Sequence, residues 1–447
     1  MKKGIILTAL VCFTAPVVFG TIITNTNQSA QYLRLLSRGA STEIDAVYYN
    51  PAGVLQMDDG FHFSFHNQTV FQDKTVVNNF PFLNESEYLG EVNVPFFPSF
   101  FAAFKTGKFA LSFGFGPNSG GGSADFASGL PSFETSFSMM PTMLTLMGLP
   151  TTAYSVDIAF NGKSVFYGFQ LNASIGLTDT FSVAAGARYI SAVNNYEGSI
   201  GNVMINPQHP LINPTGAMIS APQFFTLIGD PLTAALTSDM SLEVKQTGTG
   251  FTPIVGLHFK PVEQLNIGVR YEFKTKLELT NDTTVDDSGL FPDGYSFRKD
   301  IPAILAVGVD YALMEKLRAM LTFQMFFDKS ANWEGLEDYV DSNSFDIGFG
   351  LEYNITPSFL ISAGYLYTKV GVNEDYQSEL DFQLSSNAVA AGGKFTINNK
   401  FDIDLGAFYV MYQDDDKTIN YLIGPFLETY KQTSLGVAIG LTYHLTK

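Results

Sequence analysis

Histidine and cysteine are considered first, because they serve as bases, nucleophiles and metal ligands. The 447-residue chain has five histidines and a single cysteine, Cys12. His62 and His66 would share one face of a strand, but no third ligand lies near them in the sequence, so we expect no metal site. The sequence has no His-Glu-x-x-His, no Gly-x-Ser-x-Gly and no phosphate-binding loop. We therefore expect a protein that is not an enzyme and holds no cofactor.

Basic and aromatic residues recur at alternating positions, which would point into a lumen if the alternating segments described below close into a barrel. Cations beside apolar side chains could hold the carboxylate head and the acyl tail of an amphipathic molecule. The same cations could instead pair with neighbouring carboxylates and stiffen the lumen. The candidate residues are Arg188, Arg270, Lys274, Arg318, Lys394, Phe100 and Phe326.

Apolar side chains gather in two segments that lie between the alternating segments. Four of the 13 methionines fall within residues 139–147. Methionine is flexible and suits surfaces that accept varied apolar partners. The two segments could form an apolar outer groove, or they could pack on each other, and both can be true. The candidates are Met139, Met140, Met143, Leu144 and Met147 in one segment and Phe224, Phe225, Leu227 and Ile228 in the other.

The first 20 residues have the layout of a secretory signal peptide. Lys2 and Lys3 precede an apolar stretch that ends at Phe19, and Gly20 follows. The alternative is a membrane anchor, but the stretch is short for a spanning helix, which needs ~20 residues. Cys12 would leave with this peptide, so the mature chain would need no disulfide in an oxidising compartment.

The composition suits a folded, acidic protein. Charged residues make up 15% of the chain, its formal net charge is −18, and it contains 41 Phe, 21 Tyr and 40 Gly. Low charge with ordinary hydrophobicity does not suit a disordered chain. An acidic surface repels phosphates, so we expect no nucleic-acid partner.

Strict alternation of apolar and polar residues dominates the rest of the chain. In residues 265–279, Ile267 and Val269 fall on one strand face, and Asn266 and Arg270 fall on the other. A soluble β-sandwich alternates too. The leader, the strand lengths of ~9–11 residues and the aromatic ends of the apolar faces favour a transmembrane barrel instead. Further alternating segments are 317–328, 345–353, 359–367, 401–411 and 435–445.

Turn spacing predicts the number of strands. Short polar turns are expected at 105–108, 178–180, 260–263, 314–316, 356–358 and 398–400. Long, mostly acidic segments separate them, at 72–93, 117–162, 193–240, 280–295, 331–342, 373–384 and 413–431. Six hairpins plus one strand at each end make fourteen antiparallel strands, an even number, as bacterial barrels require. The acidic loops suit solubility, with divalent-ion contact at lipopolysaccharide as the alternative.

Residues 25–58 lack the period of two. Leu33 and Leu36 would share a helix face, Ser41 or Thr42 could cap a second short helix, and Asn50-Pro51 indicates a turn. A compact segment before the first strand of a wide barrel would fit inside the lumen as a plug. The expected organisation is therefore 1–20 signal peptide, 21–58 hatch and 59–447 barrel.

The run Gly39-Ala40-Ser41-Thr42 followed by Asn50-Pro51-Ala52-Gly53, placed after a leader and before the first strand, resembles the hatch of the FadL/TodX family. These are outer-membrane transporters of long-chain fatty acids and other hydrophobic compounds. The motif covers residues 37–53 only, whereas the resemblance in architecture covers the whole mature chain.

The resemblance implies a fourteen-strand barrel, all-β apart from a helical hatch, in the bacterial outer membrane, among its lipids and lipopolysaccharide, and acting as a monomer. It implies capture of a hydrophobic small molecule at an outer groove, binding in the lumen and lateral release at a kinked third strand. Rival functions are a general diffusion porin and a structural or adhesive surface barrel.

The hatch and the third strand supply the corresponding candidates. The third strand is expected at 108–116, and its end could open sideways or could simply lead into the glycine-rich loop 119–122. The hatch and gate candidates are Arg34, Arg38, Asn50, Pro51, Ala52 and Gly53, and the lateral-opening candidates are Gly114, Gly116 and Pro117.

Overall fold

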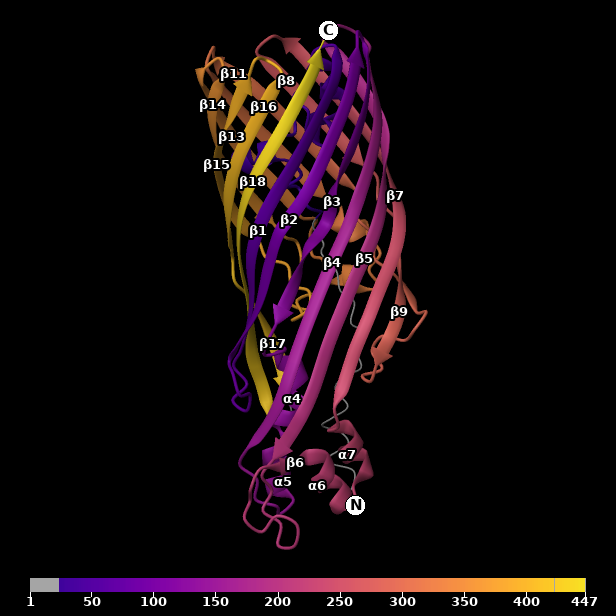
Figure 1. Cartoon of the computed structure of the whole chain (residues 1–447), viewed down its shortest axis with the longest axis vertical. Coiled ribbons are helices and arrows are strands. Elements are labelled where there is room, and N and C mark those ends of the chain that lie inside the picture. Colours follow the sequence, from indigo (N-terminus) through magenta and orange to yellow (C-terminus); the bar gives the residue numbers. More distant parts are fainter. Residues whose placement is uncertain (1–23, 422, 447) are drawn as a thin grey trace.

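The computed structural model describes residues 24–421 and 423–446, so the predicted signal peptide lies outside the described residues. The fold is a closed antiparallel barrel that surrounds an N-terminal helical plug. The barrel has 14 positions around its wall, which we call staves, and each is occupied by one strand or by two strands that follow one another in the sequence. Figure 1 shows a tall cylinder whose C-terminus lies at one end and whose helices α4 to α7 lie at the other. The predicted fold class is confirmed.

The strands are β1 (Gly60–Asn78), β2 (Glu87–Thr106), β3 (Phe109–Phe126), β4 (Tyr154–Gly176), β5 (Phe181–Ile205), β6 (Ile219–Ser220), β7 (Met240–Val262), β8 (Leu265–Glu272), β9 (Glu278–Asp286), β10 (Ser296–Arg298), β11 (Ile304–Met314), β12 (Leu317–Phe326), β13 (Phe345–Thr356), β14 (Phe359–Lys369), β15 (Ser386–Ile397), β16 (Phe401–Tyr412), β17 (Asp415–Tyr421) and β18 (Gly424–Thr446). Three staves are each built from two strands in sequence, β8 with β9, β10 with β11 and β16 with β17. The short β6 adds to the end of β5. The barrel closes where β1 pairs with β18 from Gly60↔Thr446 to Asn78↔Glu428.

The helical segments are α2 (Ala30–Leu35), α3 (Ala46–Tyr49) and the 3-10 turn η1 (Pro51–Gln56) in the hatch, and α4 (Pro131–Ser138), α5 (Met140–Leu146), α6 (Ala221–Leu227), α7 (Pro231–Leu236), η2 (Asp328–Ser330) and η3 (Leu336–Tyr339) in the loops. In the described part of the chain, no helix combines the length and the apolar character that a membrane crossing needs.

All six predicted short turns join neighbouring strands at one end of the barrel, so the predicted hairpins are correct. The strands run further toward the long-loop end than the sequence indicated. β3 continues to Phe126 instead of ending at Gly116, because β4 continues beside it and pairs with the glycine-rich run that was predicted as a loop. In the parts of the strands beyond the apolar belt, neither face meets lipid, so the sequence there lacks the alternation of apolar and polar residues by which strands were predicted.

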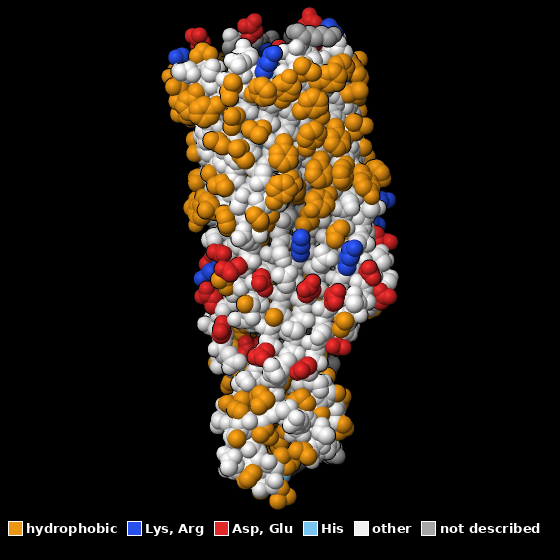
Figure 2. Space-filling model, viewed as in Figure 1, with side chains coloured by type: hydrophobic (Ala, Val, Ile, Leu, Met, Phe, Trp, Pro, Cys, Tyr) orange, Lys and Arg blue, Asp and Glu red, His pale blue; other side chains and the backbone are white. Residues whose placement is uncertain are grey.

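The outer surface is divided into bands along the barrel axis. Figure 2 shows an apolar belt at the short-turn end, then a charged band, and then a second apolar region over the loop helices. In β18 the belt consists of the exposed Leu435, Val437, Ile439 and Leu441, which alternate with inward residues such as the buried Ala438. This arrangement matches a lipid-facing surface.

Phe100 is the one predicted lumenal residue that faces outward. It pairs with the exposed Phe65, whereas its neighbour Phe101 is buried inside the barrel. The inward face of β2 changes from even to odd residue numbers between Val94 and Phe97, at a bulge where Pro95 and Phe96 of β2 lie opposite the single residue Thr69 of β1. The sequence period gave the wrong side because a bulge inserts one residue into the alternation.

Candidate functional site

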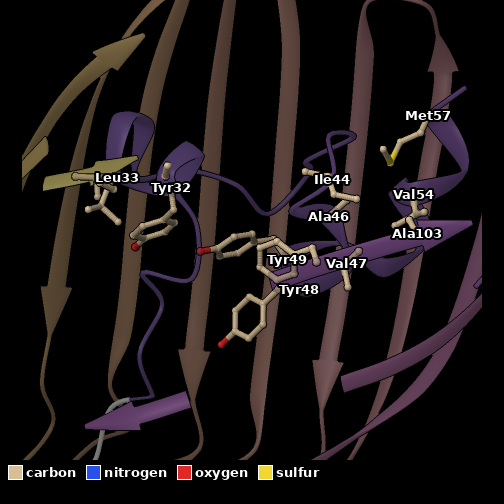
Figure 3. Close-up of a cluster of buried hydrophobic side chains, with 14 of the residues drawn as sticks. Tyr32, Leu33, Ile44, Ala46, Val47, Tyr48, Tyr49, Val54, Met57 and Ala103 are labelled. Atoms are coloured by element: carbon tan, nitrogen blue, oxygen red, sulfur yellow. The ribbon is translucent and has the colours of Figure 1, made fainter. Parts of the chain in front are cut away.

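The hatch fills the middle of the barrel with aromatic and aliphatic side chains. Ser29 caps α2 by accepting a hydrogen bond from the Tyr32 backbone N–H, and Leu36 ends that helix at φ 57°. The rings of Tyr32 and Tyr49 stack at 5.5 Å, and Tyr48 meets Tyr49 edge-on at 4.9 Å. Figure 3 shows these tyrosines, which all come from the hatch, lying together in the lumen.

Arg34 fastens the hatch to the barrel wall. Its Nε donates to Asp404 Oδ1 at 2.9 Å and its Nη1 to Glu352 Oε2 at 2.6 Å, and all three side chains are buried. Arg38 stays within the hatch and binds Asp45 and Glu43. Arg34 thus attaches the hatch to the wall, whereas Arg38 holds the hatch together internally.

Glu43 joins this network to a further wall cation. Lys394 Nζ donates to Glu43 Oε1 at 2.6 Å. Burial disfavours the charged carboxylate, but the positive charges of Lys394, Arg38 and Arg34 outweigh burial and hold the pKa of Glu43 well below its usual range. Glu43 is therefore a carboxylate in the folded protein at neutral pH.

The other predicted lumenal cations also have partners. Arg188 Nη1 donates to Glu272 Oε2 at 2.6 Å, and Arg270 Nη1 donates to the backbone oxygen of Tyr48 at 2.5 Å. Both guanidinium groups also lie on the Tyr48 ring. Arg318 binds Asp310, and Lys274 donates to Ser330 O at 2.7 Å near the loops. Of the two interpretations left open for these five cations, the structure shows paired side chains.

The Asn50-Pro51-Ala52-Gly53 turn is held by side chains from the wall. Asn50 Nδ2 lies 2.9 Å from both Ser41 O and His258 Nδ1. Ser174 donates to Pro51 O at 2.8 Å, and Ser182 donates to Ala52 O at 3.0 Å. A side chain at Gly53 would clash with Asn50 and with Ser41 O, which explains the glycine.

A cavity of about 400 Å³ lies on the loop side of the hatch. Tyr32 and Leu36 of the hatch and residues 379–384 of the β14–β15 loop are among the residues that line it. We call residues 376–384 of this loop the lid segment. Phe382 in this segment is buried and stacks on Tyr430 at 5.0 Å.

Two lysines that the sequence analysis did not single out line this cavity, Lys74 of β1 and Lys163 of β4. Lys74 Nζ lies 5.1 Å from the centre of the Phe382 ring. Asp346, Glu379 and Asp381 line the same cavity, and the negative charge of Asp381 acts on Lys74 without forming a direct ion pair. Lys74 fell inside a segment predicted as a loop, so no sequence signal indicated that it faces the lumen. Lys163 is exposed and out of phase with the buried Phe160 and Phe166, so its side chain points to the outer surface of β4.

The ladder between β2 and β3 is interrupted beside this cavity. Pairing runs from Thr106↔Phe109 to Phe100↔Phe115 and resumes only at Val92↔Ala124. On its other side, β3 bulges against β4 between Pro117 and Ser119 and between Gly120 and Gly122. Among the predicted lateral-opening residues, Gly114 lies in the paired part, whereas Gly116 and Pro117 begin the stretch without a β2 partner.

Polar side chains from the start of the hatch satisfy the free carbonyls of this stretch. Asn25 Nδ2 donates to Gly120 O at 2.6 Å, and Gln28 Nε2 donates to Pro117 O at 2.7 Å. The cavity reaches the interruption, because Val94, Phe97 and Gly121 line it. The hatch, the cavity and the interrupted ladder are therefore contiguous.

The loop helices form one apolar cluster at the far end of the molecule. Met140, Leu144, Phe224 and Phe225 are buried in it, and Met139 is buried nearby. Met143 and Ile228 are half-buried. Leu146, Met147 and Leu227 are exposed, with 83% of Leu146 and 66% of Leu227 open to solvent. The two predicted apolar segments thus pack on each other and also present an apolar outer surface (Figure 2).

Comparison with known proteins identifies the fold. No protein-family model matches the sequence, and no curated protein is significantly similar to it. Among solved structures, a Pseudomonas aeruginosa FadL homologue aligns with a TM-score of 0.64 at 12% identity, over 96% of this chain and 99% of the other.

Two toluene transporters align as well. TodX from Pseudomonas putida has a TM-score of 0.58 at 14% identity, over 95% and 100% of the two chains. TbuX from Ralstonia pickettii has a TM-score of 0.53 at 15% identity, over 90% and 94%. Over nearly its whole length, the chain therefore has the fold of the FadL and TodX channels, as the hatch motif and the strand count predicted.

Proposed function

We propose that this protein is an outer-membrane channel for passive uptake of hydrophobic molecules, with long-chain fatty acids as its cargo. The observation that carries the proposal is one continuous arrangement: a cavity between the hatch and the lid segment, which reaches an interruption in the β2–β3 ladder. A solute in this cavity borders a stretch in which residues 93–99 of β2 have no ladder partner on β3.

The cavity lining suits an amphipathic anion. Val92, Val94 and Phe97 offer apolar contacts for an acyl chain, and each buried methylene contributes ~0.8 kcal/mol. Lys74, which shares the inward face of β1 with the buried Val76, is the cation that could meet its carboxylate. The five predicted lumenal cations serve the hatch and the wall instead, since each already has a partner.

Entry and exit follow from the same geometry. The exposed Leu146, Met147 and Leu227 form the outer landing surface. The cargo passes the lid segment into the cavity, and a shift of residues 25–28 away from Pro117 and Gly120 opens the interruption toward lipid. The toluene transporters with this fold support hydrophobic cargo in general.

Ligand binding to the detergent-solubilised protein tests the proposal. We expect oleate to bind more tightly than oleyl alcohol, and expect the variant Lys74→Gln to lose this difference. The matched control is Lys245→Gln, because Lys245 is an exposed lysine outside the cavity lining. If the wild type and every variant bind oleate and oleyl alcohol equally, a fatty acid is not the cargo. If the protein binds neither probe and conducts ions, it is a general diffusion porin.

The landing surface needs a separate experiment. Leu146→Ser, Met147→Ser and Leu227→Ser together remove exposed apolar area and leave the buried cluster around Phe224 intact. We expect slower uptake of labelled oleate into cells or vesicles with unchanged equilibrium binding in detergent. Unchanged uptake would show that cargo enters elsewhere.

A further inference from the structure

A row of polar side chains follows the wall of the cavity across neighbouring staves. Each residue of the row pairs directly with the next one, except at a single step, where Tyr412 and Gln432 adjoin because they follow and precede the paired Met411 and Thr433. All of these residues line the cavity. We call them the polar row, which consists in spatial order of Asp346 (β13), Thr368 (β14), Ser386 (β15), Tyr412 (β16), Gln432 (β18) and Lys74 (β1).

The polar row lies on the inward faces of its strands. Asp346, Thr368 and Ser386 are buried, whereas the next residues in phase with the outer surface, such as Ile347 and Met411, are exposed. The row has a carboxylate at its Asp346 end and an ammonium group at its Lys74 end. Between these charges it presents hydroxyl and amide groups.

The adjacent inward row, two residues away on each strand, is apolar over the same staves. Leu366 of β14 pairs with Ala388 of β15, which pairs with Val410 of β16, and all three line the cavity. These side chains belong to or pack against the apolar cluster of the hatch. The polar row therefore borders an apolar surface on the hatch side, where an acyl chain can lie.

The Asp346 end of the row has spare hydrogen-bonding capacity. Thr368 Oγ1 donates to Asp346 Oδ1 at 2.7 Å, and a carboxylate has further acceptor positions on both of its oxygens. The hydroxyl group of a ligand could donate to Asp346 and accept from Ser386. An unsubstituted alkyl chain in the same place would cover these polar groups with methylenes and satisfy none of them, which is unfavourable.

We propose that the cavity selects long-chain acids that carry a hydroxyl group on the chain over unsubstituted fatty acids. This inference rests on the proposed function and specifies its cargo. The carboxylate of the cargo meets Lys74, and its chain follows the polar row over the apolar surface. Three strand spacings of ~4.8 Å separate Lys74 from Ser386 by about 14 Å of wall. A hydroxyl group near the middle of an extended chain as long as that of oleate lies at a comparable distance from the carboxylate.

Ricinoleate and oleate are the matched probes, because ricinoleate is oleate with one added hydroxyl group near the middle of the chain. We expect the detergent-solubilised protein to bind ricinoleate about tenfold more tightly, the effect of one hydrogen bond to a charged group. Ser386→Ala and Thr368→Val should each reduce this preference and leave the affinity for oleate unchanged. The control is Thr433→Val, which removes an exposed hydroxyl group from the outward face of β18 and should keep the preference.

The outcomes distinguish this inference from the proposed function. Equal affinities of the wild type for ricinoleate and oleate would overturn the selectivity and leave fatty-acid binding intact. A preference for ricinoleate that persists unchanged in both Ser386→Ala and Thr368→Val would also overturn the inference, because the polar row would not be the site of selection. If the wild type binds neither probe, the proposed function fails and this inference fails with it. Retention of heat-modifiable mobility on gels shows that each variant still folds.

Discussion

At the residue scale, Arg34 has the most demanding environment. It is fully buried, always charged, and surrounded by Asp404, Glu352 and Glu43. Removing one partner of a buried ion pair leaves an uncompensated charge in a low-dielectric site, which costs far more than the pair itself contributes. Arg34 therefore holds α2 against the wall, because leaving Arg34 or its carboxylate partners unpaired in this buried site would be strongly unfavourable.

We expect Arg34→Met to destabilise the docked hatch by about 3–5 kcal/mol, because Asp404 and Glu352 lose their cation. Denaturant unfolding and single-channel conductance measure this, and a loosened hatch should add fluctuating ion current. The control is Lys108→Met, which removes an exposed ion pair with Asp179 at a turn and should change neither measurement. An Arg34→Met channel with unchanged free energy of unfolding and no added current fluctuations would contradict this prediction.

At the element scale, the hatch is held at several points, and its movement can be tested by locking one of them. Ser37 Oγ of the hatch lies 2.9 Å from Thr322 Oγ1 of β12. Paired cysteines at such positions are close enough to form a disulfide. The predicted mature chain has no cysteine of its own, so the cross-link would be specific.

We expect oxidised Ser37→Cys/Thr322→Cys protein to bind oleate in its cavity and to fail in transport, with transport restored by reductant. Vesicle uptake assays before and after reduction provide the measurement, and the single variant Ser37→Cys is the control. Full transport by the oxidised double variant would show that this part of the hatch does not move.

The lid segment carries a pH-dependent contact. Glu379 accepts hydrogen bonds from Ser132 Oγ at 2.6 Å and Ser132 N at 2.9 Å. Burial and the neighbouring carboxylate of Glu428 raise the pKa of Glu379 well above its usual range. A raised carboxylate pKa means that the folded lid binds a proton more tightly than the released lid does.

The stabilisation from this proton is complete below pH ~4.3, the pKa of a free glutamate, and is lost as pH rises through the raised value. Between pH ~4.3 and the raised pKa of Glu379, we expect the hydrogen-exchange protection of residues 376–384, corrected for intrinsic rates, to fall by up to about tenfold per pH unit. Glu379→Gln should remove this dependence. A slope that persists in Glu379→Gln would assign it to another group.

At the scale of the whole molecule, the bands in Figure 2 define how the barrel sits in a bilayer. The apolar belt covers the short-turn end, and the long extensions of β4, β5 and β7 stand beyond it with charged outer faces. The cavity and the lid segment lie in this direction, between the hatch and the loops.

A charge in the belt should therefore cost more than the same charge beyond it. We expect Ile439→Arg, in the middle of the exposed run of β18, to destabilise the barrel by about 2–4 kcal/mol in lipid. Leu427→Arg, at an equally outward position of the same strand near the loops, should cost much less. Urea unfolding in vesicles compares the two, and equal costs would contradict the position of the belt.

The sequence by itself determined the barrel, because a lipid-facing wall imposes a period of two on every strand and each hairpin needs a turn that can be recognised from its residues. All six turns and the strand number followed from these local rules. The hatch was predictable for the converse reason, since residues 25–58 lack the period and carry helix and turn signals.

Only the tertiary structure decided which side chains meet. The wall partners of Arg34, Glu352 and Asp404, lie more than 300 residues away in the sequence, and His62 meets His444 because the two ends of the chain close the barrel. The phase shift near Pro95 turned Phe100 toward lipid, and the extension of β1 brought Lys74 to the cavity. These contacts depend on register and closure, which couple strands distant in sequence, so no local pattern contains them.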